Sequence, residues 1–145
     1  MTTTAIMRRK AASRRGFLCW CCAGAAGLAG LSVGASAQTP GFSRTVISKQ
    51  DYPGSDYVTL QVQVDIDAGF YIAPHTHPGV ETSTFVSGGG VLSVKGQPDR
   101  TLGAGEGFQI PAEVPHALKN GNAKARVMAV YVVEKAKPLA SPASL

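Results

Sequence analysis

The chain has few cysteines, and none of them follows residue 37. Cys19, Cys21 and Cys22 all fall within one apolar run near the N-terminus. Because no cysteine lies beyond that run, a disulfide framework cannot hold residues 38–145 together. Three cysteines so close together would suit a metal or redox site, but inside an apolar run they are better interpreted as small apolar fillers.

Acidic residues are absent from residues 1–37, which carry five of the 14 basic residues of the chain. The other nine basic residues are balanced by all nine acidic residues, so residues 38–145 have no net charge. The overall charge of +5 therefore belongs to the N-terminal segment. It gives no reason to expect nucleic acid or an anionic membrane as a partner.

The basic N-terminal segment is typical of an export address. Residues 13–18, with the sequence SRRGFL, resemble the twin-arginine export signal of bacteria, and an apolar stretch rich in Gly and Ala follows. Residues 35–37, Ala-Ser-Ala, give the small-x-small pattern that signal peptidase favours. We therefore expect residues 1–37 to be a cleavable signal peptide, cut before Gln38, and the protein to be exported folded to the periplasm or secreted. An uncleaved anchor is the alternative, since a run of about 18 residues is near the lower limit for spanning a bilayer.

Residues 38–145 contain no long apolar pattern with a helical period and no internal repeat. Short alternating runs separated by Gly, Pro, Asn and Asp predict an all-β sandwich or barrel of about ten strands. The clearest run is Tyr57–Ile66, in which apolar and polar residues alternate, so that one side is buried and the other faces solvent. We expect one domain with its core at about 45–134 and a tail, residues 135–145, that is an arm or disordered.

The chain has only three histidines, and their spacing indicates a metal site. His75 and His77 are two residues apart, so on a strand both imidazoles point to the same side. Glu81 adds an oxygen ligand from beyond the turn that Pro78 and the following glycine predict. With His116 as the third imidazole, this set suits a first-row divalent metal.

The residues around these histidines form two spaced motifs. The first, G-x5-H-x-H-x3-E-x6-G, begins at Gly69, and the second, G-x5-P-x4-H-x3-N, begins at Gly105. Together they resemble the paired signature motifs of the cupin superfamily. The resemblance implies a double-stranded β-helix, the jelly-roll cupin barrel. It also implies a single divalent ion, of manganese, iron, nickel or zinc, bound by His75, His77, Glu81 and His116.

One position departs from the second motif. Glu113 stands where the family usually has glycine, which suggests a tight turn with positive φ, and glutamate in that conformation would cost about 1 kcal/mol. The turn could instead differ, because Val114 precedes Pro115 and is pushed towards extended geometry. A further interpretation makes Glu113 a residue at the mouth of the site that acts on substrate. We favour a structural role.

No acid–base partner stands beside the expected ligands, so the catalytic residues are unknown at this point. If the strands keep their alternation, some side chains share a face with the ligands. These candidate pocket walls are Tyr71, Ser83, Phe85 and Leu118. Further candidates, whose faces the pattern leaves open, are Phe108, Met128 and Tyr131. For any one of them, plain core packing is the alternative.

Three functions remain open from the sequence. Four protein ligands leave one or two positions free on a six-coordinate metal, which suits a metal-dependent oxygenase, isomerase or decarboxylase acting on a small oxygen-bearing compound. The alternatives are a module that binds metal or a small ligand without turnover, and a structural metal in a small barrel. A single domain without a DNA-binding region excludes the transcription-factor use that the family also shows. We expect a homodimer with a small-molecule ligand, no nucleic-acid partner and, after signal cleavage, no membrane partner.

Overall fold

The structure is a computed structural model that describes residues 39–145. The expected signal peptide, residues 1–37, lies outside the described residues together with its cysteines, so the prediction of export is not tested by the fold. Between residues 39 and 145 there is no helix long and apolar enough to cross a bilayer.

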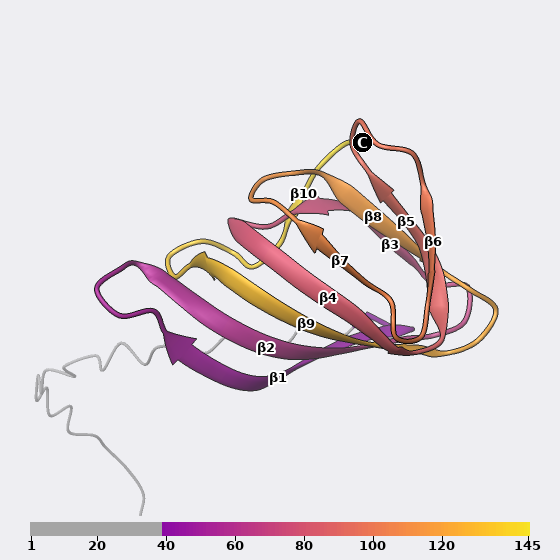
Figure 1. Cartoon of the computed structure of the whole chain (residues 1–145), viewed down its shortest axis with the longest axis horizontal. Helices are drawn as coiled ribbons and strands as arrows, with labels where there is room; N and C mark the ends of the chain where they lie inside the picture. The colour runs from indigo at the N-terminus through magenta and orange to yellow at the C-terminus, as the bar shows by residue number, and fades with distance from the viewer. Residues whose placement is uncertain (1–38) are drawn as a thin grey trace, which may run out of the picture. The chain divides into compact units, whose positions relative to one another are not determined.

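Ten β-strands within residues 39–145 form two antiparallel five-stranded sheets, which confirms the all-β prediction (Figure 1). In spatial order, the first sheet consists of β1 (Phe42–Asp51), β2 (Tyr57–Ile66), β9 (Ala125–Glu134), β4 (Gly79–Ser87) and β7 (Gly107–Ile110). The second consists of β10 (Ser141–Pro142), β3 (Tyr71–Thr76), β8 (His116–Asn120), β5 (Gly89–Val94) and β6 (Arg100–Gly103).

The alternation along β2 shows how the sheets pack. Val62 and Ile66 are buried, whereas Gln63 and Asp65 on the other side of the strand remain partly exposed. Each fully buried aliphatic side chain contributes about 1.5–3 kcal/mol, so a core of this kind can hold a domain without disulfides. Both sheets contribute to that core, whose largest completely buried apolar side chains are Phe85, Ile66, Leu92, Ile110 and Val62.

Strands that are far apart in the sequence pair at the centre of both sheets. β9 lies between β2 and β4, and β8 lies between β3 and β5. The chain therefore passes repeatedly from one sheet to the other, which is the topology of a double-stranded β-helix, or jelly roll. One consequence of the β3–β8 pairing is that His75 stands directly opposite His116.

The turn between β4 and β5 is very short. Only Gly88, with a φ of 73°, lies in the turn, and Gly89 already begins β5. A Cβ atom at Gly90 would lie 2.5 Å from the backbone carbonyl oxygen of Lys119 on β8. The glycines therefore allow β5 to approach its neighbouring strands closely, which a pattern of turn residues cannot reveal.

The tail that was expected to be an arm or disordered is an ordered arm. Its strand β10 pairs with β3, with Ser141 opposite Thr76, and the amide of Ala143 donates to the carbonyl of Pro74 at 3.0 Å. The side chain of Leu139 packs against the core. The arm therefore completes the edge of the second sheet beside the strand that carries His75.

Candidate metal centre

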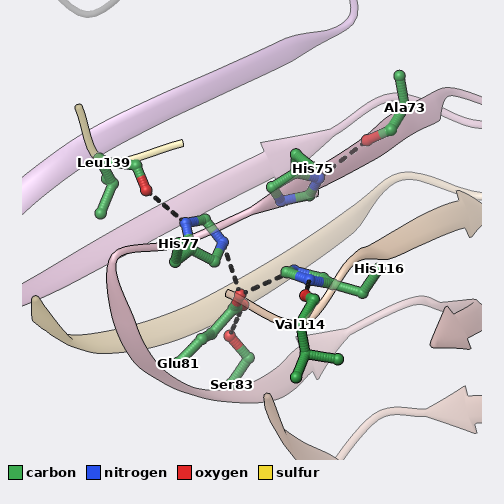
Figure 2. A network of polar contacts seen from close by, with 8 residues as sticks. All are labelled: Ala73, His75, His77, Glu81, Ser83, Val114, His116 and Leu139. Atoms are coloured by element: carbon green, nitrogen blue, oxygen red, sulfur yellow. Dashed lines mark hydrogen bonds and ion pairs between the residues drawn. The ribbon is translucent and has the colours of Figure 1, made fainter. Parts of the chain in front are cut away.

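Strands from both sheets bring the expected ligands together (Figure 2). His75 lies on β3 and His116 lies opposite it on β8. His77 follows the last residue of β3, and Glu81 lies on β4 after the turn at Pro78. The side chains of His77, Glu81 and His116 are buried, and that of His75 is half-buried.

The three imidazole rings form a compact cluster. One ring nitrogen from each histidine lies within 4.8 Å of those of the other two. The ring centroids are 4.3 Å apart for His75 and His116, 4.9 Å for His75 and His77, and 5.2 Å for His77 and His116. Burying three imidazoles together is costly unless their nitrogens share a partner. The three histidines could therefore hold a metal ion.

Each of the three rings has its Nδ1 atom against a backbone carbonyl oxygen. The pairs are His75 with Ala73 at 2.8 Å, His77 with Leu139 at 2.5 Å and His116 with Val114 at 3.0 Å. A carbonyl oxygen only accepts hydrogen bonds, so Nδ1 carries the proton in each ring. In a neutral imidazole the lone pair is then on Nε2, which is the usual arrangement of a metal-binding histidine.

The carboxylate of Glu81 lies between two of the rings. Its Oε2 is 2.9 Å from Nε2 of His77 and 3.2 Å from Nε2 of His116, and its Oε1 accepts a hydrogen bond from Ser83 at 2.5 Å. Despite this short distance, Nε2 of His77 has no hydrogen-bond partner among the described residues, because the oxygen lies outside the direction of the bond. Atoms that share a metal ion, with bonds of about 2.1 Å, lie about 3 Å apart. The spacing at His77 therefore fits two ligands of one cation, whereas Nε2 of His116 also has hydrogen-bond geometry with the same oxygen.

The charges at the cluster also fit a divalent cation. Burial opposes ionisation of Glu81, but its contacts with His116 and His77 outweigh burial and hold the pKa of the carboxyl well below its usual range. Burial lowers the pKa of His75 to about 4, so this ring is neutral at pH 7. An ionised carboxylate in this buried position attracts a cation, and a divalent ion bound beside it would supply the positive charge.

A cavity of about 30 Å³ adjoins the cluster, with room for one or two water molecules. His75, Glu81 and His116 form one side of it. The rest of its wall is mostly apolar and includes Val64, Ile66, Ile72, Leu92 and Val127. A compound in this cavity would touch three of the four expected ligands on one side and mostly apolar side chains, together with Arg44, on the others.

The residues expected as pocket walls fall into two groups. Those that line the cavity are Leu118, Phe108 and Tyr131. Those that do not are Tyr71, Ser83, Phe85 and Met128. Ser83 lies instead against Glu81, and Phe85 is completely buried in the core.

The prediction that Tyr71 lines the pocket was wrong, because this residue is 49% exposed. The expected alternation along β3 is interrupted by a register shift between Ile72 and His75. One extra residue in a strand reverses which side chains face inward beyond it. Ile72, and not Tyr71, therefore shares the cavity with His75.

Glu113 adopts a φ of 60°, and no other residue apart from glycine has a positive φ within residues 39–145. Its backbone N–H donates to the carbonyl of His77 at 2.9 Å. Its side chain is exposed and does not line the cavity. The turn before β8 thus keeps the left-handed conformation for which the family uses glycine, and this favours a structural role for Glu113.

Two features of the site were not expected from the sequence. Arg44 lines the cavity, but the core of the domain was expected to begin only at about residue 45, whereas β1 begins at Phe42. An alternating apolar and polar run that extended back to Phe42 would have indicated that Arg44 belongs to this strand. The carbonyl of Leu139, which binds His77, has no sequence signal, because every residue offers the same backbone group.

The sheets and the buried cluster define a jelly-roll domain with a histidine-rich site that could hold a metal. The model of the cupin domain family matches residues 62–131, which include the three histidines and Glu81. The chain is a small cupin-domain protein. No curated protein matches it in sequence.

Several solved structures share this fold at low sequence identity. The DMSP lyase DddQ from Ruegeria pomeroyi DSS-3 is 24% identical, with a TM-score of 0.54 over 61% of this chain and 44% of the lyase, so the match spans less than half of the lyase's length. KdgF from Halomonas sp. is 21% identical, with a TM-score of 0.54 over 65% of this chain and 82% of KdgF. The polyketide cyclase RemF from Streptomyces resistomycificus is 19% identical, with a TM-score of 0.56 over 72% of each chain.

Proposed function

We propose that this protein is a mononuclear metal-binding cupin with His75, His77, His116 and Glu81 as its ligands. The observation that carries the proposal is the orientation of the three rings. Each Nδ1 donates to a backbone carbonyl, so each Nε2 keeps a lone pair for the metal. The carboxylate of Glu81 beside two of these nitrogens supplies the negative charge.

The bound ion, of the manganese, iron, nickel or zinc group, would supply Lewis-acid or redox chemistry at its open positions. The residues of the chain prepare the site for it. Ser83 fixes the carboxylate of Glu81, and the apolar wall of the cavity limits access of water. Burial and the nearby Glu81 raise the pKa of Tyr131 above its usual range, so its hydroxyl keeps its proton at the edge of the cavity.

The reaction we propose is that of an oxygenase or isomerase on a small oxygen-bearing compound. It is supported by the position of the cavity, which three of the four proposed ligands border. An oxygen atom of a compound in this cavity would lie beside the open face of the site. The DMSP lyase and the polyketide cyclase that share the fold are consistent with such chemistry on small molecules.

Metal analysis tests the ligand set. Protein depleted of metal with a chelator and then supplied with Zn²⁺ is expected to bind one ion per chain, measured by elemental analysis and by competition with a chromophoric chelator. Glu81→Gln keeps the shape but removes the charge, and should weaken binding by about 100-fold. Asp99→Asn, the same change at an exposed turn, should leave binding unchanged. Equal affinity of wild type and Glu81→Gln would contradict the proposed site.

Catalysis needs a separate experiment. Iron-loaded protein is expected to consume oxygen in the presence of one class among small phenols, diketones and thiols, and Glu81→Gln should abolish the uptake. If no class produces uptake and NMR detects no isomerised product, the enzymatic part of the proposal is wrong, whatever the metal content.

A binding module without turnover is the second candidate, and the small volume of the cavity, about 30 Å³, favours it. Such a cavity suits retention of a small ligand more readily than the exchange of substrate and product. Tight binding of a small compound to the metal-loaded protein, recovered chemically unchanged after long incubation, would support this function over the enzyme.

We also propose that the protein is exported in folded form by the twin-arginine route. The support is the arginine pair Arg14 and Arg15 ahead of an apolar stretch. Replacing both by lysine keeps the charge and should hold the full chain in the cytoplasm, whereas the wild type should reach the periplasm cut before Gln38. Export of the double variant at the wild-type level would contradict this route.

A further inference from the structure

Arg44 brings a positive charge to the cavity from the edge strand of the first sheet. It lies on β1 opposite Val64 of β2, and both side chains line the cavity together with His75 and Glu81. The guanidinium carbon of Arg44 lies 4.7 Å from the ring centroid of Phe42, two residues earlier on the same strand. The aromatic ring thus covers one side of the guanidinium group, and the N–H groups in its plane remain available.

No acidic side chain neutralises Arg44 within residues 39–145. Its Nε is buried and has no hydrogen-bond partner there, and no ion pair joins it to a carboxylate. The exposed Arg126, in contrast, pairs with Asp65 at 2.7 Å. Glu81, the carboxylate that shares the cavity, is already held by two histidines and a serine. A buried Nε–H donor without an acceptor is costly, so a ligand that accepts a hydrogen bond from Arg44 would be favoured in the cavity.

The rest of the cavity indicates what kind of anion would fit. Among the described residues that line it, Arg44 is the single lysine or arginine and Glu81 the single acidic residue, so a ligand with one negative charge at most fits. Its other walls away from the histidines are hydrocarbon and aromatic. The volume of about 30 Å³ admits only a few atoms. A planar carboxylate matches the fork of N–H donors on arginine, and a short apolar chain matches the wall.

We infer that the cavity binds a short-chain monocarboxylate whose carboxylate pairs with Arg44 while its apolar part lies against Val64 and Ile72. The inference rests on the proposed function, because it names the class of compound held beside the metal. The inferred pairing of the carboxylate with Arg44 does not, however, require a bound metal ion. Loss of the carboxylate contact should therefore weaken ligand binding without changing metal affinity.

The experiment measures binding of formate and acetate by NMR titration, with formamide and acetamide as neutral controls of the same shape. It is carried out on metal-depleted and on Zn²⁺-loaded protein. The acids are expected to bind the metal-depleted protein at least about tenfold more tightly than the amides. Arg44→Met should remove this difference, and Arg44→Lys, which keeps the charge but lacks the fork, should keep part of it. Arg126→Met, at an exposed ion pair, should keep all of it.

The outcomes separate the two proposals. Equal affinity for acids and amides, or acid binding that Arg44→Lys and Arg44→Met leave unchanged, overturns the inference even if the protein binds one Zn²⁺. Acid binding that depends on Arg44 supports it even in protein that binds no metal, in which case the proposed metal centre fails alone. Thermal unfolding of each variant shows whether it is folded. If Arg44→Met does not fold, the comparison of Arg44→Lys with the wild type provides the result.

Discussion

The backbone carbonyl of Leu139 accepts a hydrogen bond from Nδ1 of His77 at 2.5 Å, across 62 residues of sequence. This contact connects the C-terminal arm to the centre of the site (Figure 2). It keeps the proton on Nδ1 and holds Nε2 at 2.9 Å from Oε2 of Glu81. The arm is held in turn by the pairing of β10 with β3. A segment that looks like a loose tail in the sequence therefore orients one of the proposed ligands.

Removal of the arm should weaken metal binding. Deletion of residues 138–145 removes the carbonyl of Leu139, and the Zn²⁺ affinity measured by chelator competition should fall by about 10–100-fold. Deletion of residues 144–145 alone keeps β10 and the His77 contact and should have little effect. The ¹⁵N shifts of the His77 ring should show the Nδ1-protonated form in the full chain and a mixture after the longer deletion. Unchanged shifts and affinity would refute the role of Leu139.

Ser83 should contribute to metal affinity through Glu81. Its hydroxyl is buried and donates to Oε1 of the carboxylate, and hydrogen bonds to charged groups are worth about 1.5–3 kcal/mol. Ser83→Ala should therefore lower the Zn²⁺ affinity by about tenfold or more, in the same competition assay. Ser87→Ala on the exposed end of β4 is the matched control and should bind like the wild type. A Ser83→Ala protein with wild-type affinity would show that Glu81 needs no such support.

Glu113→Gly should stabilise the protein by about 1 kcal/mol. The residue has a φ of 60°, which glycine adopts without the steric penalty of a Cβ atom. The gain is measured as a shift of the urea midpoint with an unchanged slope. Glu113→Ala keeps the Cβ atom and should not be stabilised. Similar gains for both variants would mean that loss of the glutamate side chain, and not relief of backbone strain, is responsible.

Asn120 contacts three backbone carbonyls through one amide group. Its Nδ2 lies 3.3, 2.8 and 3.0 Å from the carbonyl oxygens of Ile66, Asp67 and Ala123. Asn120→Asp replaces this donor by a carboxylate oxygen facing carbonyls, and should lower the free energy of unfolding at pH 7 by about 3 kcal/mol. Asn122→Asp, the same change at an exposed position two residues on, should cost under about 0.5 kcal/mol. A small loss at Asn120 would show that the amide is not a structural clamp.

Much of the fold could be predicted from the sequence, because its strongest patterns are local. The strand Tyr57–Ile66 has the bounds that alternation indicates. Motif spacing likewise selected the three histidines that the structure brings within 4.8 Å. Alternation failed at Tyr71, because a bulge is set by pairing with β8 and not by the residues of β3 alone. Contacts such as that of Leu139 depend on strands that meet only after the whole chain has folded.

Metal binding should stabilise the fold, because an ion that binds the native state alone shifts the unfolding equilibrium. At a free Zn²⁺ concentration 100 times its dissociation constant, the gain is about 2.7 kcal/mol, or roughly 10 °C in the melting temperature of a domain of this size. The measurement is thermal unfolding of chelator-treated protein with and without Zn²⁺.

The variant His77→Gln loses one ligand, so Zn²⁺ should raise its melting temperature by only a small fraction of that shift. Each variant is compared with its own metal-free form. Asp99→Asn should respond like the wild type. An equal response of His77→Gln would place the stabilising ion elsewhere on the protein, since the buried Nε2 of His77 could not then be among its ligands.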